Sequence, residues 1–298
     1  MKMRGGRMLM LILAAGCFSC LSPGTSAEEY YSLGQAYLEL GRYEEAERWF
    51  NRARMADKTR TASEYNLGRI AFERGRYQEA AEIFDKILAQ DPENVTALRA
   101  AAYTRIRTGE FIKAQLLYDR VLALVPESAD DGYNYALVLY AMNQYDRAEA
   151  VLRKYTFALD ENADALLLLA RCEGKQDKPE AADRYGQWLK TNSNPAVRYE
   201  YARALEKLSY YARALEEYRS ALNAFTSDTE DLRRCDIRFA LARVLLVADP
   251  EGEEGMNELR SAVAEGFSDK EALRALLPAE GLSEDRRREI QGIIDQTG

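Results

Sequence analysis

Small residues recur along this chain at a fixed interval, and that recurrence restricts its fold more than any other feature. A glycine or an alanine stands at five positions that are 34 residues apart, and an alanine follows each of them by 12 residues. A sixth copy arrives two residues early. Self-similarity at such a period is typical of proteins built by stacking one supersecondary motif. The first series is Gly34, Gly68, Ala102, Ala136, Ala170 and Ala202, and the second is Ala46, Ala80, Ala114, Ala148, Ala182 and Ala214.

Each unit has the pattern of two short helices joined by a tight turn. In the first copy, apolar residues recur at helical spacing on both sides of Gly41. A glycine just past a helix end adopts the left-handed conformation that stops the helix, and Gly75 and Gly109 take the same place in the next two copies. Asn143 and Asp177 follow in copies four and five, and both tolerate that conformation. We therefore predict an antiparallel helix pair in each unit, with the small residues where two helices cross.

Prolines and further glycines mark where helices end or weaken. Pro92 and Pro126 close the second helix in copies two and three, because proline cannot continue a helix. The fifth copy has Gly174 and Gly186 inside its helices and Pro179 near the start of its second helix. We expect that copy to be the softest of the array.

The repeat becomes degenerate toward the C-terminus. Residues 235–266 keep two helical patterns, but the turn at Asp249–Gly252 is blurred. Two closing helices are predicted at Asp269–Leu277 and Ser283–Gln296, with Asp285–Glu289 giving the polar exterior that a solenoid cap requires. The predicted organisation is a signal peptide at 1–16, a short tether at 17–26, six clear repeats plus one degenerate repeat at 27–265, and capping helices at 266–298.

The unit resembles the tetratricopeptide repeat. The resemblance covers residues 27–265 and implies an all-α fold, a right-handed α-solenoid of stacked helix-turn-helix repeats. The first copy departs from the family pattern at Lys58, where a terminal proline is expected. The matching residues are Leu33, Gly34, Tyr37, Gly41, Tyr43, Ala46, Phe50 and Ala53 in the first copy, and Leu67, Gly68, Gly75, Tyr77, Ala80, Phe84 and Pro92 in the second.

The first residues have the layout of a secretory signal. Lys2, Arg4 and Arg7 precede the apolar run Met8–Ala15, and no acidic residue appears before Glu28. The apolar stretch is shorter than the roughly 20 residues that a transmembrane helix needs. We therefore expect an exported, periplasmic protein.

Two routes of processing remain open. Ala14-Ala15-Gly16-Cys17 resembles a bacterial lipoprotein signal, in which the cysteine after a small residue is lipidated and becomes the mature N-terminus. Cys20 is the alternative lipidation site. The other route is ordinary cleavage after Ala27. With lipidation, the protein contacts the membrane only through its lipid anchor.

The composition disfavours several classes of function. The chain has no histidine, which removes Ser-His-Asp and Cys-His nucleophile systems and any zinc site that needs imidazole. The net charge of −8 argues against nucleic-acid binding, which needs a basic surface. We find no phosphate-binding glycine loop and no nucleophile elbow, and we predict no enzyme activity, no cofactor and no metal. Cys172 and Cys235 lie in different repeats and are predicted to be buried, unpaired thiols.

The resemblance to the family places certain positions of each first helix in a concave groove. Tyrosine and arginine dominate these positions, and both are favoured at contact hot spots. Asparagine at this unit position in the family can hold a ligand's backbone amide, which gives Asn66 and Asn134 that role. The groove residues are Tyr65, Asn66, Arg69, Phe72, Arg99, Tyr103, Arg107, Tyr133, Asn134 and Tyr140, with Tyr31, Gln35, Leu137, Arg171, Tyr199 and Arg203 beside them.

Structural interpretations compete with these assignments. Arg69 is four residues before Glu73, and Arg203 is three after Glu200, so each arginine can form an ion pair within its own helix. Other tyrosines occupy packing positions and are predicted to belong to the core. These are Tyr37, Tyr43, Tyr77 and Tyr145.

Together these features predict a non-catalytic scaffold in the bacterial cell envelope. Its Tyr/Arg-lined groove would bind an envelope protein or peptide. The alternative is a small-ligand-binding accessory protein of a transporter. The sequence leaves the oligomeric state open.

Overall fold

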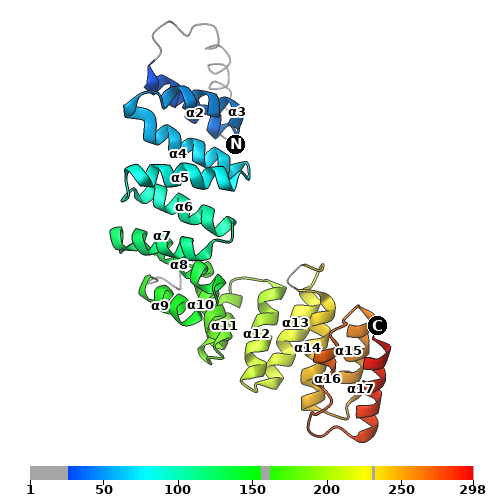
Figure 1. Cartoon of the computed structure of the whole chain (residues 1–298). Helices are drawn as coiled ribbons and strands as arrows, with labels where there is room; N and C mark the ends of the chain where they lie inside the picture. The colour runs from blue at the N-terminus through cyan, green and yellow to red at the C-terminus, as the bar shows by residue number, and fades with distance from the viewer. Residues whose placement is uncertain (1–25, 156–161, 230–231, 298) are drawn as a thin grey trace, which may run out of the picture. The chain divides into compact units, whose positions relative to one another are not determined.

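The computed structural model describes residues 26–155, 162–229 and 232–297 (Figure 1). The predicted signal peptide and both candidate lipidation cysteines, Cys17 and Cys20, lie outside the described residues. Within them every regular element is an α-helix, which confirms the all-α prediction. None of these helices combines the length and the apolar character that a membrane span requires. The helices are α2 (Ala27–Glu39), α3 (Tyr43–Ala53), α4 (Asp57–Glu73), α5 (Tyr77–Gln90), α6 (Val95–Arg107), α7 (Phe111–Leu124), α8 (Ala129–Ala141), α9 (Tyr145–Tyr155), α10 (Ala163–Lys175), α11 (Glu180–Leu189), α12 (Pro195–Lys207), α13 (Tyr211–Ala224), α14 (Arg234–Ala248), α15 (Glu253–Ala264), α16 (Lys270–Arg274) and α17 (Glu284–Gln296).

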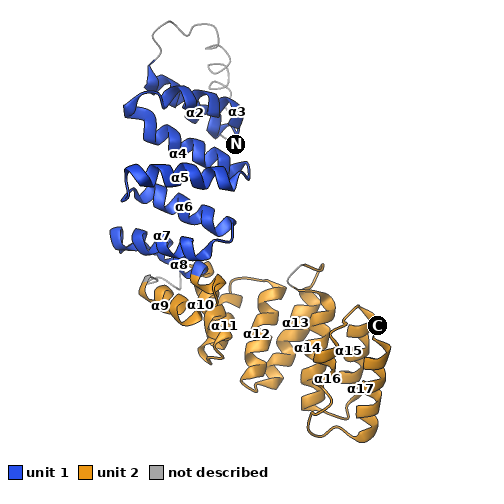
Figure 2. Cartoon of the chain, viewed as in Figure 1, with its two compact units in different colours: residues 1–138 blue, residues 139–298 orange. Residues whose placement is uncertain are grey.

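The helices fall into two compact units, residues 1–138 (unit 1) and 139–298 (unit 2), coloured separately in Figure 2. In unit 1 each helix from α2 to α7 packs against its neighbours in sequence, and the same holds from α9 to α15 in unit 2. First helices of neighbouring pairs also touch in unit 1, α2 with α4 and α4 with α6. Stacking of helix pairs in this way is an α-solenoid, the architecture that the repeat predicts.

The recurring small residues lie where the two helices of a pair cross. A Cβ added to Gly34 would come within 2.7 Å of Phe50 Cδ1, and one added to Gly68 within 2.6 Å of Phe84 Cε1. Both phenylalanine side chains are fully buried, so the glycines allow a close approach that no other residue would. The corresponding alanines of the later copies are fully buried as well. The predicted role of these positions is confirmed.

The turns also follow the sequence pattern. The predicted left-handed positions have φ values of 69° to 74° at the three glycines, 58° at Asn143 and 56° at Asp177. Ser209 has the same conformation, at 61°, in the sixth copy, where the sequence analysis made no prediction. Helices α5 and α7 end two residues before Pro92 and Pro126, as expected.

The C-terminal region is more regular than the sequence indicated. Helices α14 and α15 form a complete pair despite the blurred turn, and α16 and α17 occupy the ranges of the predicted closing helices, α16 being shorter. The Phe239 and Phe267 rings stack with centroids 4.1 Å apart in the core of this region. One expectation was wrong: Arg286 is not part of a polar exterior. Its side chain is buried and donates to the Glu251 carbonyl oxygen at 2.7 Å and to Glu253 at 3.0 Å.

The tyrosine assignments to the core are only partly correct. Tyr37 is buried, but Tyr43, Tyr77 and Tyr145 are half-buried, because each begins a second helix next to the turn and its ring borders solvent. The two cysteines of the repeats, Cys172 and Cys235, are buried and unpaired, as predicted.

Candidate functional site

A chain of polar side chains joins the first helices α2 and α4 in unit 1. Asn66 is only 4% exposed. Its amide nitrogen donates to the Tyr31 hydroxyl at 3.2 Å and to the Ala62 carbonyl oxygen at 3.0 Å, and its amide oxygen accepts from Arg69 at 3.3 Å. Gln35 donates to the same Tyr31 hydroxyl at 3.1 Å. The amide assigned to ligand binding therefore already has partners at both ends, and a ligand reaches it by displacing Tyr31 or Arg69.

Arg69 itself is exposed and keeps its charge available. Of the described residues, no carboxylate forms an ion pair with its guanidinium, so the predicted pairing with Glu73 is wrong. The Arg69 guanidinium instead donates to the Asn66 amide oxygen. Arg69 lines a cavity of about 370 Å³ together with Gln35, Glu39 and Glu73.

An aromatic cluster continues the same face onto α6. The Phe72 ring lies 5.1 Å from the Tyr77 ring and 5.2 Å from the Tyr103 ring, centroid to centroid. The Arg107 guanidinium sits 5.2 Å from the centroid of Tyr77 and donates to its hydroxyl at 2.8 Å. Tyr103 is 48% exposed. The structure thus brings Phe72, Tyr103 and Arg107 together, as the sequence analysis expected.

Arg99 has a different role from the one predicted for it. Its Nε donates to both carboxylate oxygens of Asp131, at 2.9 and 3.0 Å, and its Nη2 donates to Oδ2 at 2.5 Å. Asp131 is only 3% exposed, and a buried carboxylate needs such a partner. Arg99 therefore joins α6 to α8 and is not available to a ligand without uncovering Asp131. Asp131 was not among the residues predicted from the sequence.

The remaining predicted positions divide between the units. Tyr65 is half-buried and packs its ring 5.7 Å from Phe84, so it supports the core of unit 1 as much as the surface. Tyr133 and Asn134 are half-buried on α8 in unit 1. Tyr140, at the end of the same helix, belongs to unit 2, where burial raises the pKa of its hydroxyl.

In unit 2, the first helices are joined by arginine–carboxylate pairs. Arg171 on α10 donates to both oxygens of Glu200 on α12, at 2.9 and 3.0 Å. Arg243 on α14 donates to both oxygens of Glu206 on α12, at 2.8 Å each. Glu200 pairs with Arg171, and Arg203 forms no ion pair with it, so the competing interpretation of Arg203 as the partner of Glu200 is wrong.

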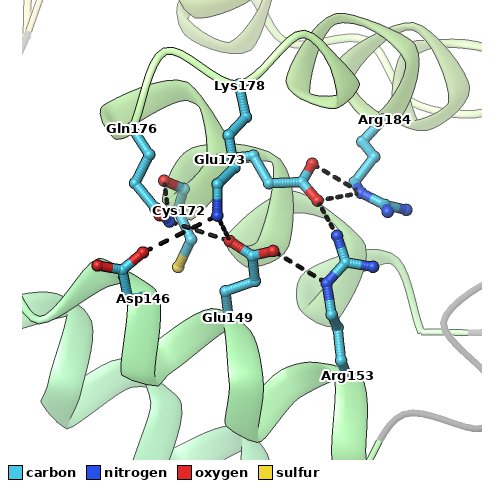
Figure 3. A network of polar contacts seen from close by, with 8 residues as sticks. All are labelled: Asp146, Glu149, Arg153, Cys172, Glu173, Gln176, Lys178 and Arg184. Carbon is cyan, nitrogen blue, oxygen red and sulfur yellow. Dashed lines mark hydrogen bonds and ion pairs between the residues drawn. The ribbon is translucent and has the colours of Figure 1, made fainter.

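A second ionic network, shown in Figure 3, lies between α9, α10 and α11. Glu173, 0% exposed, accepts from Arg184 Nε at 2.8 and 2.7 Å and from Arg153 at 2.8 Å. Glu149 accepts from Lys178 at 2.8 Å, from Arg153 at 3.0 Å and from Gln176. Burial raises the pKa of Glu149, but these hydrogen bonds outweigh it and the pKa lies below its usual range. The network joins three helices of unit 2 around a carboxylate, that of Glu173, with no exposed surface.

Comparison with known families supports the repeat directly. Residues 27–60 match one tetratricopeptide-repeat family and residues 71–130 match another. Residues 107–185 match the family described as anaphase-promoting complex, cyclosome, subunit 3. No curated protein matches the chain in sequence.

Solved structures of similar fold cover most of the chain. A tetratricopeptide-repeat protein from Parabacteroides merdae aligns with a TM-score of 0.59 at 19% identity, over 91% of this chain and 100% of that one. The pilF protein of Pseudomonas aeruginosa aligns with a TM-score of 0.53 at 21% identity, over 78% and 96%. YrrB, described as a TPR protein with an unusual peptide-binding site, aligns with a TM-score of 0.55 at 19% identity, over 65% and 98%.

The stacked helix pairs and the face made by their first helices define a helical-repeat protein of the α-solenoid class. The family matches identify the repeats. Residues 27–60 and 71–130 match tetratricopeptide-repeat families, and the chain as a whole is similar in fold to a tetratricopeptide-repeat protein.

Proposed function

We propose that this chain is a non-catalytic scaffold of the bacterial cell envelope that binds an extended segment or a helix of a partner protein. The observation that carries the proposal is the first-helix face of unit 1. There an aromatic surface, the exposed Tyr103 with the half-buried Phe72, lies beside Arg69 and Arg107, which form no ion pair with a carboxylate of the described residues. YrrB, which has a similar fold, is described as having a peptide-binding site, and this supports the same use here.

Each group on this face has a defined part in binding. Tyr103 and Phe72 offer rigid aromatic area, which loses little side-chain entropy on contact. The Tyr77 hydroxyl and ring hold the Arg107 guanidinium in place, so that less freedom is lost when it meets a carboxylate or carbonyl of the partner. Arg69 adds a second cation at the neighbouring cavity.

The test is the double variant Arg69→Glu with Tyr103→Ala, compared with wild type by crosslinking in intact cells. We expect the crosslinked partner to be lost, because one contact is reversed in charge and the other loses its ring. A matched control is Lys86→Glu with Leu116→Ala, which changes an exposed cation and an exposed aliphatic residue on the second helices α5 and α7. Retention of every partner by the groove variant, or equal loss in the control, would contradict the proposal.

The start of α2 bears on how the chain is processed. Ser26 caps this helix: its hydroxyl accepts from the Glu29 backbone N–H at 3.3 Å, and the Glu29 carboxylate accepts from the Ser26 N–H at 2.7 Å. Cleavage after Ala27 would remove Ser26 and place a positive α-amino group at the helix N-terminus, where the helix dipole disfavours it. Lipidation at Cys17 or Cys20 leaves the cap in place, and the cap therefore favours this route over cleavage after Ala27.

Mass spectrometry of the mature N-terminus tests the route of processing. We expect a diacylglyceryl-modified start at Cys17 or Cys20, and a start at Glu28 would refute the anchor. The cap is tested separately by Ser26→Ala in the exported protein, which should lower the free energy of unfolding by about 1 kcal/mol in chemical denaturation. An unchanged value would show that Ser26 does not stabilise α2.

A further inference from the structure

Two cavities adjoin on the first-helix face of unit 2. One, of about 270 Å³, lies between α10 and α12, and the other, of about 510 Å³, lies between α12, α14 and the segment that follows α16. Arg203 and Lys207, on the last turn and a half of α12, line both of them. The two cavities therefore lie next to each other along α12, share these two side chains, and are together called the groove of unit 2.

Cations outnumber carboxylates in the lining of this groove. It contains two carboxylates, Glu200 and Glu206, and more than twice as many cationic side chains, although the whole chain has a net charge of −8. A basic groove on an acidic protein raises the local concentration of anionic ligands. The cations are Arg171, Lys175, Arg203, Lys207 and Arg243.

Both groove carboxylates are fully engaged by other groups. Glu200 accepts two hydrogen bonds from Arg171. Glu206 accepts two from Arg243 and a third from the Tyr218 hydroxyl, at 2.7 Å. Both carboxylates are thus already paired with arginines of the same groove.

Two of the cations consequently have no carboxylate partner among residues 26–155, 162–229 and 232–297. Lys207 pairs with Asp177, but Lys175 and Arg203 form no ion pair. The Arg203 guanidinium lies over the Tyr199 ring, 5.9 Å from its centroid, with its donors left for a ligand. Both side chains are exposed and line the smaller cavity.

The larger cavity adds an apolar end to the groove. Val247 on α14 is 44% exposed although it borders the cavity, and Pro278 and Ala279 form the facing wall. An exposed aliphatic side chain inside a concave site is a contact point for another apolar group. Charge and apolar surface thus follow one another along α12.

We infer that this groove binds an acidic peptide segment that carries an aliphatic side chain, with carboxylates at Lys175 and Arg203 and the aliphatic group against Val247. The inference rests on the proposed scaffold function and names the chemistry of a segment that unit 2 recognises. Charge complementarity selects this occupant: a basic segment would face unneutralised cations, and a purely apolar one would leave them desolvated.

The test uses fluorescence anisotropy with the full chain and a short labelled peptide that repeats Glu-Leu-Asp-Gly. We expect binding that weakens as salt is raised. The variant Lys175→Glu with Arg203→Glu should weaken it by at least about tenfold, since charged hydrogen bonds are lost. Val247→Asp should weaken it as well. The matched control is Lys190→Glu with Arg219→Glu, the same change in net charge at two exposed sites outside the groove, and it should bind like wild type.

Three further probes decide what is recognised. A peptide with lysine in place of the acidic residues should not bind, and one with serine in place of leucine should bind more weakly. A free dicarboxylic acid that competes as strongly as the peptide would overturn the inference in favour of a small ligand. Equal binding by the groove variant and the control would overturn it too. Unit 1 is untouched by these variants, so if the Arg69 and Tyr103 variant still loses its partner, the scaffold function stands while this inference fails.

Discussion

The two units build the same repeat but join their first helices by different interactions. In unit 1 the contacts among α2, α4 and α6 are aromatic and amide, Asn66 with Tyr31 and Phe72 with Tyr103, whereas the contact of α6 with α8 is ionic, Arg99 with Asp131. In unit 2 they are ionic, through Arg171 with Glu200 and Arg243 with Glu206. The buried network around Glu173 adds to the ionic character of unit 2. The repeat pattern thus fixes where helices cross, and it leaves open which chemistry holds their exposed faces.

The same difference appears in what each face offers a ligand. The cavity of unit 1 has one cation, Arg69, and two carboxylates, Glu39 and Glu73. The groove of unit 2 has an excess of cations, two of them without carboxylate partners among the described residues. One fold therefore presents two surfaces of different charge, which would suit different kinds of segment.

The largest expected effect concerns the buried network of unit 2. Arg184→Met removes a partner that donates to both oxygens of Glu173, whose carboxylate has no exposed surface. Breaking a buried ion pair from one side leaves a poorly compensated charge, and we expect a loss of about 3 kcal/mol. Hydrogen exchange followed by mass spectrometry should show loss of protection in α10 and α11, because the stability of a repeat array is local.

Two variants show whether the charge is the cause. Arg219→Met, at an exposed pair with Glu254, should change stability by less than about 1 kcal/mol. Adding Glu173→Gln to Arg184→Met should restore part of the loss, since a neutral amide is less costly to bury. If the double variant were as unstable as the single one, packing by Arg184 and not charge would be responsible.

Replacing a helical glycine with alanine should change the free energy of unfolding in opposite directions in the two units. Gly68→Ala places a Cβ within 2.6 Å of the buried Phe84 ring, and overpacking of about 1–3 kcal/mol outweighs the better helix propensity of alanine. A Cβ added to Gly174 meets Tyr185 at 3.5 Å and the Ala181 Cβ at 3.9 Å, both ordinary contacts, so Gly174→Ala should stabilise α10 by up to about 1 kcal/mol. Urea denaturation of both variants measures the two changes in the free energy of unfolding. If both changes had the same sign, the close helix approach at Gly68 would not distinguish unit 1 from unit 2.

The fold was predictable because its signals are local and periodic. A small residue at Gly68 and a left-handed turn at Gly75 each follow from one position in the repeat, and the structure confirms both. Ser209 escaped prediction because serine has no strong preference for the left-handed turn that the surrounding repeat imposes. Arg286 was misplaced because a run of charges gives no sign of which member points inward.

The exposed face was less predictable because its contacts reach from one repeat to the next. The position of Arg99 in the repeat predicts a groove residue. The structure shows that Arg99 instead forms an ion pair with Asp131 of the following first helix. The pairs Arg171 with Glu200 and Glu206 with Arg243 are likewise about one repeat apart. A search for opposite charges at that separation is the signal that the sequence offered.

The left-handed turns also differ between the units, and substitutions there should change the free energy of unfolding by less than those in the helices. Unit 1 has Gly75 at this position, with φ of 74°, whereas unit 2 has Ser209, with φ of 61°. A side chain in this conformation costs roughly 1–2 kcal/mol relative to glycine, part of which is offset by the freedom of glycine in the unfolded chain. Ser209→Gly should therefore stabilise by about 0.5–1 kcal/mol, and Gly75→Ser should destabilise by a similar amount in thermal denaturation. Equal and opposite shifts would show that the turn, and not its surroundings, sets the difference.

The smallest expected effect is a pH dependence of stability that arises from Glu110 in unit 1. Hydrogen bonds from Lys113, Arg105 and Thr108 lower the pKa of Glu110 to about 2 in the folded chain, against about 4.3 when unfolded. The folded state thus binds fewer protons, so the stability that Glu110 contributes is present above about pH 4.3 and is lost as the pH falls toward 2. Because the carboxylate is near the surface, Glu110→Gln should cost less than about 1 kcal/mol at pH 7 and nothing near pH 2. Glu127→Gln, at an exposed carboxylate that forms no ion pair with the described residues, is the control. A cost for Glu110→Gln that stayed constant across this range would show that the lost stability comes from the shape of the turn and not from the charge.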